Sequence, residues 1–196
     1  MLSFDPATHI YKLDGVVIPS VTQVLADVGL SPDYPAEQRQ FYLNRGTAVH
    51  RACELLVAGK LDKNNTDPRL HGYVDSFDRF LQRTGFKPDL VEHRVWSEAY
   101  LVGGSLDYCG PLNGVQTILD VKSGEPAAAA ALQTAAYAYL LKESHGLVAS
   151  RRLTLRLDPD GGEPKPEEYM DFNNDLRVFL SAVAVWHWRA RRNLIK

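Results

Sequence analysis

Cysteine is scarce in this sequence, and long apolar runs are missing. Only Cys53 and Cys109 occur among the 196 residues, too few for a disulfide framework or for a zinc or iron–sulfur site with four cysteine ligands. No run of about 18 apolar residues could cross a bilayer, and the opening MLSFDPATH lacks the basic-then-apolar order of a signal peptide. We therefore expect a cytoplasmic protein without membrane association, in which both thiols are reduced and buried.

A large excess of either charge is also missing. The chain has 22 Lys and Arg against 24 Asp and Glu, a net charge of −2, so the molecule as a whole does not attract a polyanion. A polyanion would have to meet a local patch. The last ten positions carry Arg189, Arg191, Arg192 and Lys196 without an acid. They are either such a patch or the solvated end of a helix whose dipole favours cations.

The pattern of apolar residues predicts one α/β domain in which helices flank a mixed central β-sheet. Two short apolar runs around Asp14-Gly15 favour a small hairpin. Ser20 followed by Gln23 is a capping-box pattern, which begins a helix that Gly29 and Pro32 should end after about Val28.

The rest of the chain alternates between helical and strand patterns. Helices are predicted from Ala36, from Gly46 to about Ala58, from Arg69 to Arg83, from Pro126 to the break at 144–146, and from Asp171 to Arg192; strands are predicted at 90–96, 101–109, 115–121 and 152–157. The segment 158–166 is expected to be a surface loop. The strand at 152–157 should lie parallel to the one at 115–121, because a strand–helix–strand sequence forms a crossover unit.

Two aspartates and a lysine carry the strongest chemical signal. Asp120 and Lys122 lie two positions apart at the end of an apolar strand, in ILDVKSG, so both side chains face one way. Alone, this pair is most often solvated. Asp107, in GGSLDYCG, should lie beside Asp120 in a hairpin that turns at Asn113-Gly114. Two converging carboxylates repel each other unless a cation such as Mg²⁺ or Mn²⁺ lies between them.

Two helices could add polar groups to this site. His50 and Glu54 share one face of the helix after Gly46, and a histidine there can bind a metal. Gln133 and Tyr137 share a face of the alanine-rich helix, which can pack close to the sheet. The alternative for each residue is ordinary packing or surface exposure, so the functional interpretation depends on the two aspartates.

Taken in order, GTAVH, GGSLDYCG, ILDVKSG and QTAAYAY resemble the motif series of RecB-like nucleases in the PD-(D/E)XK superfamily. The opening segment with IPSVTQVL is also similar to phage-encoded exonucleases and the mitochondrial genome maintenance exonuclease, so the resemblance covers about residues 4–142. It implies a single nuclease domain with a PD-(D/E)XK, restriction-endonuclease-like core. Within it we assign an N-terminal hairpin and helices to 1–45, the catalytic core to 46–157, and a loop and C-terminal helix to 158–196.

The resemblance also implies roles for particular residues. His50, Asp107, Asp120 and the Val121 carbonyl would bind Mg²⁺ or Mn²⁺, and Lys122 would position the attacking water. Gln133 and Tyr137 match a Q-x-x-x-Y helix that supports the site and contacts the nucleic-acid strand. Glu92 matches a common acid of the family, although nearby Glu98 is an alternative. The iron–sulfur cluster of some members is excluded because it needs four cysteines.

The expected activity is metal-dependent hydrolysis of DNA phosphodiester bonds by an exonuclease acting on single-stranded or end-exposed DNA. The resemblance places such an enzyme in recombination or repair, in the cytoplasm of a bacterium or of a phage-infected host. It also suggests a single-strand annealing or binding protein as a partner, which the residues themselves do not indicate. A structure-selective endonuclease on the same core and a catalytically silent DNA-binding subunit remain alternatives.

Overall fold

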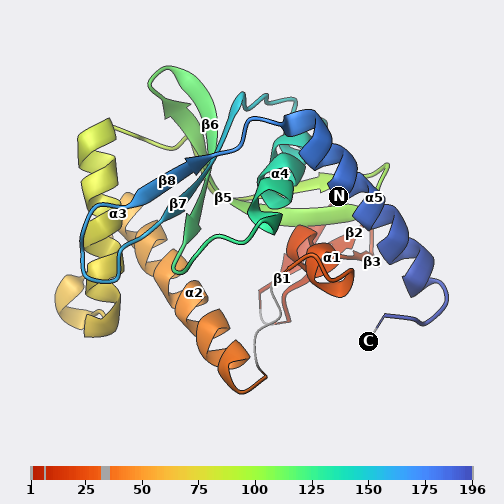
Figure 1. Ribbon diagram of the computed structural model, residues 1–196, viewed down its shortest axis with the longest axis horizontal. Helices are drawn as coiled ribbons and strands as arrows, with labels where there is room; N and C mark the ends of the chain where they lie inside the picture. The colour runs from red at the N-terminus through yellow and green to blue at the C-terminus, as the bar shows by residue number, and fades with distance from the viewer. Residues whose placement is uncertain (1, 7, 32–35, 196) are drawn as a thin grey trace.

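The computed structural model describes residues 2–6, 8–31 and 36–195, which form two β-sheets and the helices around them (Figure 1). The central sheet has five strands in the order β4-β5-β6-β7-β8. These strands are β4 (Leu90–Ser97), β5 (Val102–Leu112), β6 (Val115–Lys122), β7 (Arg151–Arg156) and β8 (Lys165–Glu168). Only β6 and β7 pair in parallel, and the other neighbours are antiparallel. The predicted α/β class with a mixed central sheet is confirmed.

The N-terminal sheet consists of β1 (Leu2–Asp5), β2 (Ile10–Leu13) and β3 (Val16–Ile18), all antiparallel. Its β2–β3 hairpin confirms the prediction: Asp14 and Gly15 have φ values of 48° and 86°, the left-handed conformations that a two-residue turn of this kind requires. The strand β1 was not predicted. Tyr11, Leu13 and Ile18 form a small core beneath this sheet.

The first helix, α1 (Val21–Asp27), begins as the capping pattern predicts. The Ser20 hydroxyl accepts the backbone N–H of Gln23 at 3.0 Å, which satisfies one of the unpaired donors at the start of a helix. Gly29 follows the helix with a φ of 80°. Pro32, the second predicted stop, lies outside the described residues.

The longer helices form a layer on each side of the central sheet (Figure 1). They are α2 (Ala36–Val57), α3 (His71–Thr84), α4 (Ala129–His145) and α5 (Phe172–Ala190), with short 3₁₀ turns at Lys63–Asn65 and Pro68–Leu70. One core joins α2 and α3 to the sheet through residues such as Phe77, Tyr108 and Leu155. The other joins α1, α4 and α5 to its opposite side through residues such as Leu106 and Phe179. None of the described helices is both long and apolar enough to span a membrane.

Three details of the predicted elements are wrong. The two helices expected from Ala36 and from Gly46 are one continuous helix, α2, because a single glycine costs only about 1 kcal/mol inside a helix. Pro126 does not begin α4, which starts at Ala129. The end of the expected loop, near Pro166, belongs to the edge strand β8, whose four residues are all exposed.

Gly46 and Gly104 give opposite predictions for substitution by alanine. A Cβ added at Gly46 meets nothing within 4 Å beyond its own helix backbone, so Gly46→Ala should raise the free energy of unfolding by up to about 1 kcal/mol through helix propensity. A Cβ added at Gly104 would lie 2.9 Å from Tyr137 Cε1, so Gly104→Ala should lower it by about 1–3 kcal/mol. Urea unfolding measures both effects. A Gly104→Ala protein as stable as wild type would contradict the close packing of Tyr137.

Candidate metal centre

The site lies where the β5–β6 hairpin opens. The described pairing of these strands runs from Leu112↔Val115 to Tyr108↔Leu119 and ends there. Beyond it, the Asp107 side chain takes over the role of a backbone partner, since its Oδ2 accepts the backbone N–H of Val121 at 2.7 Å. The predicted turn at Asn113-Gly114, with φ values of 52° and 77°, therefore brings Asp107 to the end of β6 that also carries Asp120.

Three side chains from three elements converge at this opening. The possible ligand atoms of His50, Glu92 and Asp107 all lie within 4.8 Å of one another. His50 Nδ1, on α2, lies 3.3 Å from Asp107 Oδ2 and 3.9 Å from Glu92 Oε1. Glu92 has a φ of 46°, which is strained for a residue with a side chain, and it interrupts the pairing of β4 with β5 between Val91↔Tyr108 and His93↔Leu106. Backbone strain of this kind is commonly kept at functional sites.

A second group of polar side chains lies beside these three. The Lys122 ammonium donates to Gln133 Oε1 at 2.9 Å. The Gln133 amide in turn donates to Asp120 Oδ1 at 3.1 Å and to the Tyr137 hydroxyl at 3.3 Å. Helix α4 is thus tied to the end of β6 by side-chain hydrogen bonds. Asp120 does not belong to the group of three within 4.8 Å.

One oxygen of Asp120 is left without a hydrogen bond. Lys122 Nζ lies 2.7 Å from Asp120 Oδ2, but outside hydrogen-bonding geometry, so this buried oxygen has no hydrogen-bond partner among the described residues. The Lys122 ammonium compensates the charge of this oxygen, and a water or a metal ion could supply the contact that is missing.

Burial and neighbouring charges shift the proton affinities of these groups. Burial raises the pKa of Asp120 to about 6, although the Lys122 ammonium opposes the shift. Burial alone would lower the pKa of His50, but the Asp107 carboxylate more than compensates, and that pKa lies well above its usual value. Burial alone would raise the pKa of Asp107, but the charge on His50 lowers it by more, so the pKa of Asp107 lies below its ordinary range. Protonated His50 therefore carries a positive charge beside the carboxylates of Asp107 and Glu92, where a metal cation could bind instead.

The spacing of the three ligands fits a small divalent cation. Octahedral coordination at about 2.0–2.1 Å places adjacent ligand atoms about 3 Å apart and opposite ones about 4.2 Å apart. The separations of 3.3 and 3.9 Å in this group are close to those values. Two carboxylates and one imidazole suit Mn²⁺ well and Mg²⁺ through their oxygens. Asp120 Oδ2, which is ion-paired with Lys122 but accepts no hydrogen bond from the described residues, could add a further oxygen ligand.

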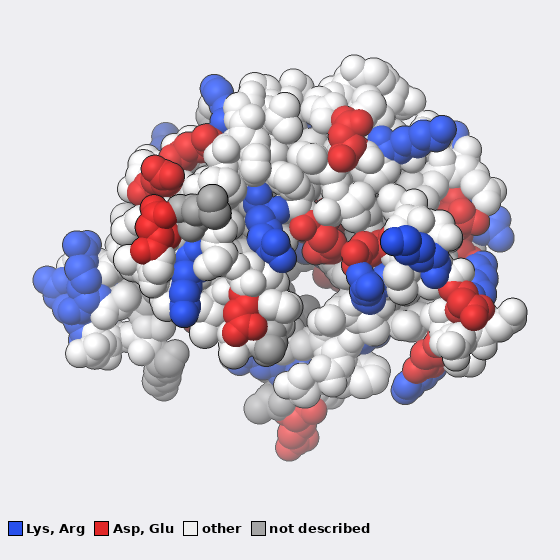
Figure 2. All heavy atoms as spheres, turned by 180° about the vertical axis from the view of Figure 1, so that it is seen from behind, with Lys and Arg blue, Asp and Glu red and all other residues white. Residues whose placement is uncertain are grey.

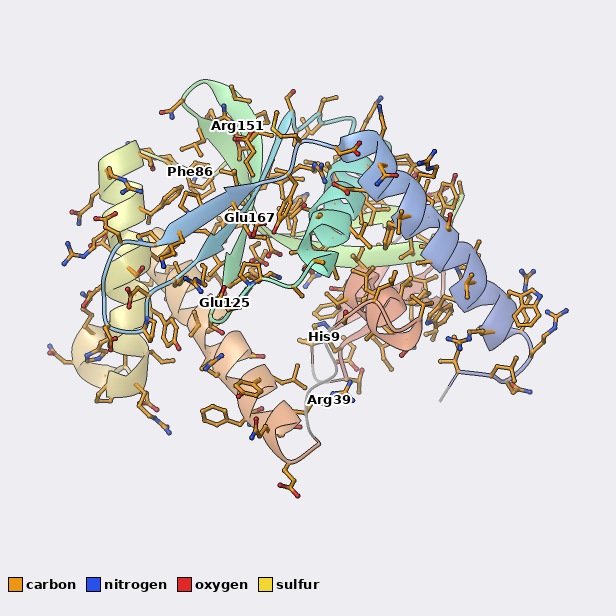
Figure 3. All side chains as sticks on the ribbon, in the orientation of Figure 1. His9, Arg39, Phe86, Glu125, Arg151 and Glu167 are labelled. Atoms are coloured by element: carbon orange, nitrogen blue, oxygen red, sulfur yellow. The ribbon has the colours of Figure 1, made fainter. Side chains whose placement is uncertain are left out.

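A cleft of about 440 Å³ opens over this group. His50, Glu92, Asp107 and Lys122 line it together with Gln133 and Tyr137, and the N-terminal sheet and α1 contribute the opposite wall through His9, Tyr11, Ser20 and Thr22. Seen from behind, the surface is hollowed near its centre, with acidic and basic side chains around the hollow (Figure 2). His9, which lines the cleft, lies beside the N-terminal sheet, and Glu125 lies in the loop between β6 and α4 (Figure 3).

Most residues singled out in the sequence gather around this cleft. The structure brings together His50, Asp107, Asp120, Lys122, Gln133 and Tyr137, with the Val121 N–H directed at Asp107. Of the two alternative acids, Glu92 lies in the centre, whereas Glu98 is exposed in the turn after β4. Glu54 forms an ion pair with Arg51.

Tyr11 was missed as a cleft residue. Its hydroxyl lies 2.9 Å from the Ser105 hydroxyl, and only the alternating pattern of the hairpin hinted that it would be buried. The cleft is not lined by Arg189, Arg191 or Arg192, and α5 ends at one side of the molecule (Figure 1).

No protein-family profile matches the chain, and no curated protein sequence matches it.

Glu92 and Glu98 provide a matched pair of acids for a test of metal binding. Glu92→Gln should raise the dissociation constant for Mn²⁺ about tenfold or more, because it removes one charged ligand. Glu98→Gln removes the same charge from an exposed turn and should leave the affinity unchanged. Electron paramagnetic resonance of unbound Mn²⁺ during titration measures both. Equal affinities in the two variants would show that the cation, if bound, lies elsewhere.

Asp120 should make the stability of the metal-free protein depend on pH. Because burial raises its pKa from 3.8 to about 6, the folded state binds more protons than the unfolded state between these values, and stability should fall as the pH rises through this window. Asn imitates the protonated acid. In EDTA at pH 8, Asp120→Asn should therefore be about 2–3 kcal/mol more stable than wild type, with little difference near pH 4. Urea unfolding at both pH values measures this, and a variant no more stable at pH 8 would refute it.

Proposed function

We propose that this protein is a metal-dependent deoxyribonuclease with a PD-(D/E)XK core, which hydrolyses phosphodiester bonds. The observation that carries the proposal is the convergence of His50, Glu92 and Asp107 within 4.8 Å, next to the Asp120 and Lys122 pair at the end of a central strand. A site for a divalent cation beside a fixed ammonium group suits an anionic phosphodiester. The mixed sheet and its flanking helices are compatible with such a core.

Hydrolysis would need a cation that activates water and a positive charge that stabilises the phosphate, and the chain has residues for both. A cation held by His50, Glu92 and Asp107 would lower the pKa of a water molecule and neutralise charge on the phosphate. Lys122, held by Gln133 at 2.9 Å, presents a positive charge of fixed position to the phosphate oxygens. Asp120 Oδ2 accepts no hydrogen bond in the described structure, so it can accept one from the attacking water or bind the cation.

The preference for DNA that is single-stranded or has a free end rests on the resemblance of the motif series. The walls of the cleft come from α2 on one side and from the N-terminal sheet and α1 on the other, and a strand would enter between them. Tyr137 and Gln133 line this cleft and could contact the strand beside the bond that is cut.

Removal of single charged groups at the centre should abolish most activity. Asp107→Ala, Asp120→Ala and Lys122→Ala should each lower kcat on end-labelled DNA about a thousandfold or more, which corresponds to about 4 kcal/mol of transition-state stabilisation. Glu98→Gln serves as the control and should retain wild-type activity. Circular dichroism establishes that each variant is folded. A folded variant at any of the three positions with near-wild-type turnover would contradict the assignment.

The same assay separates the alternative functions. An exonuclease should degrade linear single-stranded or double-stranded DNA and spare covalently closed circles in Mg²⁺ or Mn²⁺, with no cleavage in EDTA. Cleavage of circles at a rate equal to that of linear DNA would instead indicate an endonuclease. No cleavage with either metal would indicate a DNA-binding subunit without catalytic activity.

A further inference from the structure

The cleft over the metal centre continues into two further cavities. The second cavity, of about 400 Å³, shares His50, Lys122 and Gly46 with the cleft. The third cavity, of about 360 Å³, shares Ser123 and Gly124 with the second cavity and extends to β7 and β8. The three cavities therefore follow one another from the N-terminal sheet, past the end of β6, to the end of β7 and the start of β8, and together they form a groove.

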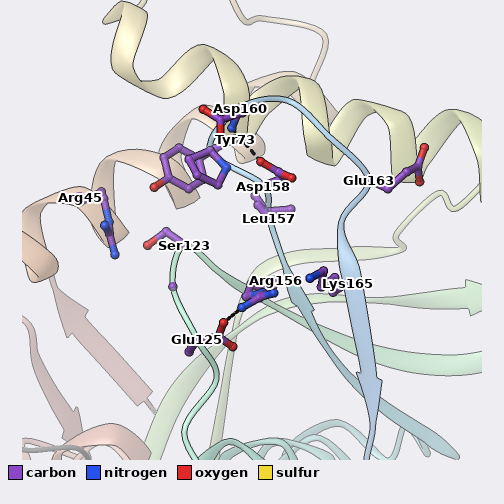
Figure 4. A pocket seen from close by; sticks show the side chains of 12 residues that line it. Arg45, Tyr73, Ser123, Glu125, Arg156, Leu157, Asp158, Asp160, Glu163 and Lys165 are labelled. Carbon is purple, nitrogen blue, oxygen red and sulfur yellow. Dashed lines mark hydrogen bonds and ion pairs between the residues drawn. The ribbon is translucent and has the colours of Figure 1, made fainter.

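Arg45 lies where the second and third cavities meet, since it lines both. It is on α2, and its side chain is directed toward Ser123 and the end of β6 (Figure 4). A Cβ on Gly124 would lie only 3.2 Å from Arg45 Nη2. The absence of a side chain at Gly124 thus lets the guanidinium approach the backbone that follows Lys122.

No acid among the described residues neutralises this guanidinium. The buried Arg45 Nε has no hydrogen-bond partner among the described residues, and no carboxylate within the described ranges forms an ion pair with it. Its described contacts are to the rings of Phe41 and Tyr42, at 5.9 and 5.1 Å. Arginine keeps its charge at all physiological pH values. A charged group whose buried N–H lacks a hydrogen bond is energetically unfavourable unless an anion accepts that hydrogen bond and pairs with the charge.

Three of the four acids that line the third cavity have partners other than Arg45, and the fourth, Asp160, forms no ion pair with Arg45 in the described structure. Glu125 pairs with Arg156 and Glu163 with Arg83, as the dashed line between Glu125 and Arg156 shows (Figure 4). Asp158 accepts the backbone N–H of Asp160. Lys165 also lines this third cavity and its side chain has no partner among the described residues, but of these two cations it is Arg45 that also lines the second cavity, beside Lys122. The planar fork of Arg45 matches the oxygens of a phosphate.

We propose that Arg45 binds a phosphate of the DNA strand that neighbours the scissile phosphate, so that the groove holds several nucleotides of one strand. This inference rests on the proposed function. The Ser123 hydroxyl, at the same junction, is placed to donate to the same phosphate. The phosphate is either an internal one or the one at a strand end, because both present the same oxygens to the guanidinium.

Binding measured without turnover tests the role of Arg45. The probe is a labelled twelve-nucleotide thymidine oligomer, titrated in EDTA with protein that carries Asp120→Asn. Adding Arg45→Ala should weaken binding about tenfold or more and reduce the salt slope of log K by about 0.7, the share of one phosphate on a single strand. Arg45→Lys should restore the salt slope, because it restores the charge.

Arg39→Ala is the matched control. Arg39 is exposed on the same helix, near the start of α2 and before Arg45 (Figure 3), and it lines none of the three cavities. This variant should bind the oligomer within about twofold of the parent protein. Equal losses for Arg39→Ala and Arg45→Ala, no loss for Arg45→Ala, or no binding by the parent would each overturn the proposal. A loss that Arg45→Lys does not reverse would also overturn it, by assigning Arg45 to packing.

Different forms of the probe distinguish the two sources of the phosphate. If Arg45 holds a strand end, Arg45→Ala should affect only the 5′-phosphorylated oligomer. If it holds an internal phosphate, the 5′-hydroxyl form and a circular single strand should lose equally. If Arg45→Ala weakens DNA binding but the wild-type protein cleaves no DNA, the nuclease is refuted and Arg45 remains a phosphate-binding residue. If the wild-type protein cleaves DNA but Arg45→Ala does not weaken binding, the nuclease is supported and the role of Arg45 is refuted.

Discussion

Burial of like charges at the opening of the β5–β6 hairpin is the constraint on which the rest of the structure depends. Asp107 and Asp120 are 6% and 1% exposed, and carboxylates taken out of water cost several kcal/mol each unless they are paired. Three elements around the opening contribute a partner: α2 provides His50, the end of β6 provides Lys122, and α4 provides Gln133. The charges of the site therefore determine how the two helical layers meet the sheet.

The packing of α4 follows from this requirement. Gln133 and Tyr137 can reach the end of β6 only if the helix lies close to the sheet, and the buried Ala129, Ala130, Ala135 and Ala136 permit this. On the strand side, Gly104 leaves room for the Tyr137 ring, 2.9 Å from where a Cβ would be. These small residues thus allow the polar side chains of α4 to reach the site, although an alanine-rich sequence by itself suggests only close packing of the helix.

Local patterns were enough to predict much of the fold. Alternation, caps and turn dipeptides identified α1, the central hairpins and the parallel crossover from β6 to β7, because each depends on residues near one another in sequence. The edge strand β8 was missed because its Lys165–Glu168 segment has no buried face and contains Pro166, which a strand tolerates only at an edge. The prediction divided helix α2 at Gly46 because helix propensity is a local property of the sequence and takes no account of the packing of α2 against the rest of the protein.

The site was predictable only in part, for a physical reason. Asp107, Asp120 and Lys122 follow from strand period and hairpin pairing, whereas the choice of Glu92 over Glu98 depends on a backbone irregularity, the φ of 46°, that no sequence pattern encodes. Arg45 was overlooked because its significance arises from the cavities that meet around it.

The charges of the site also imply an order of binding under the proposed function. Glu92, Asp107 and Asp120 bring three acids to the cleft against the ammonium of Lys122 and at most one proton on His50. Without a cation, a phosphate at this centre faces an excess of negative charge whenever the acids are ionised. A divalent cation removes that excess, so it should bind before the scissile phosphate. Until then a strand can be held only by cations beyond the carboxylates, and Arg45 is placed along the groove where it can hold one without occupying the centre.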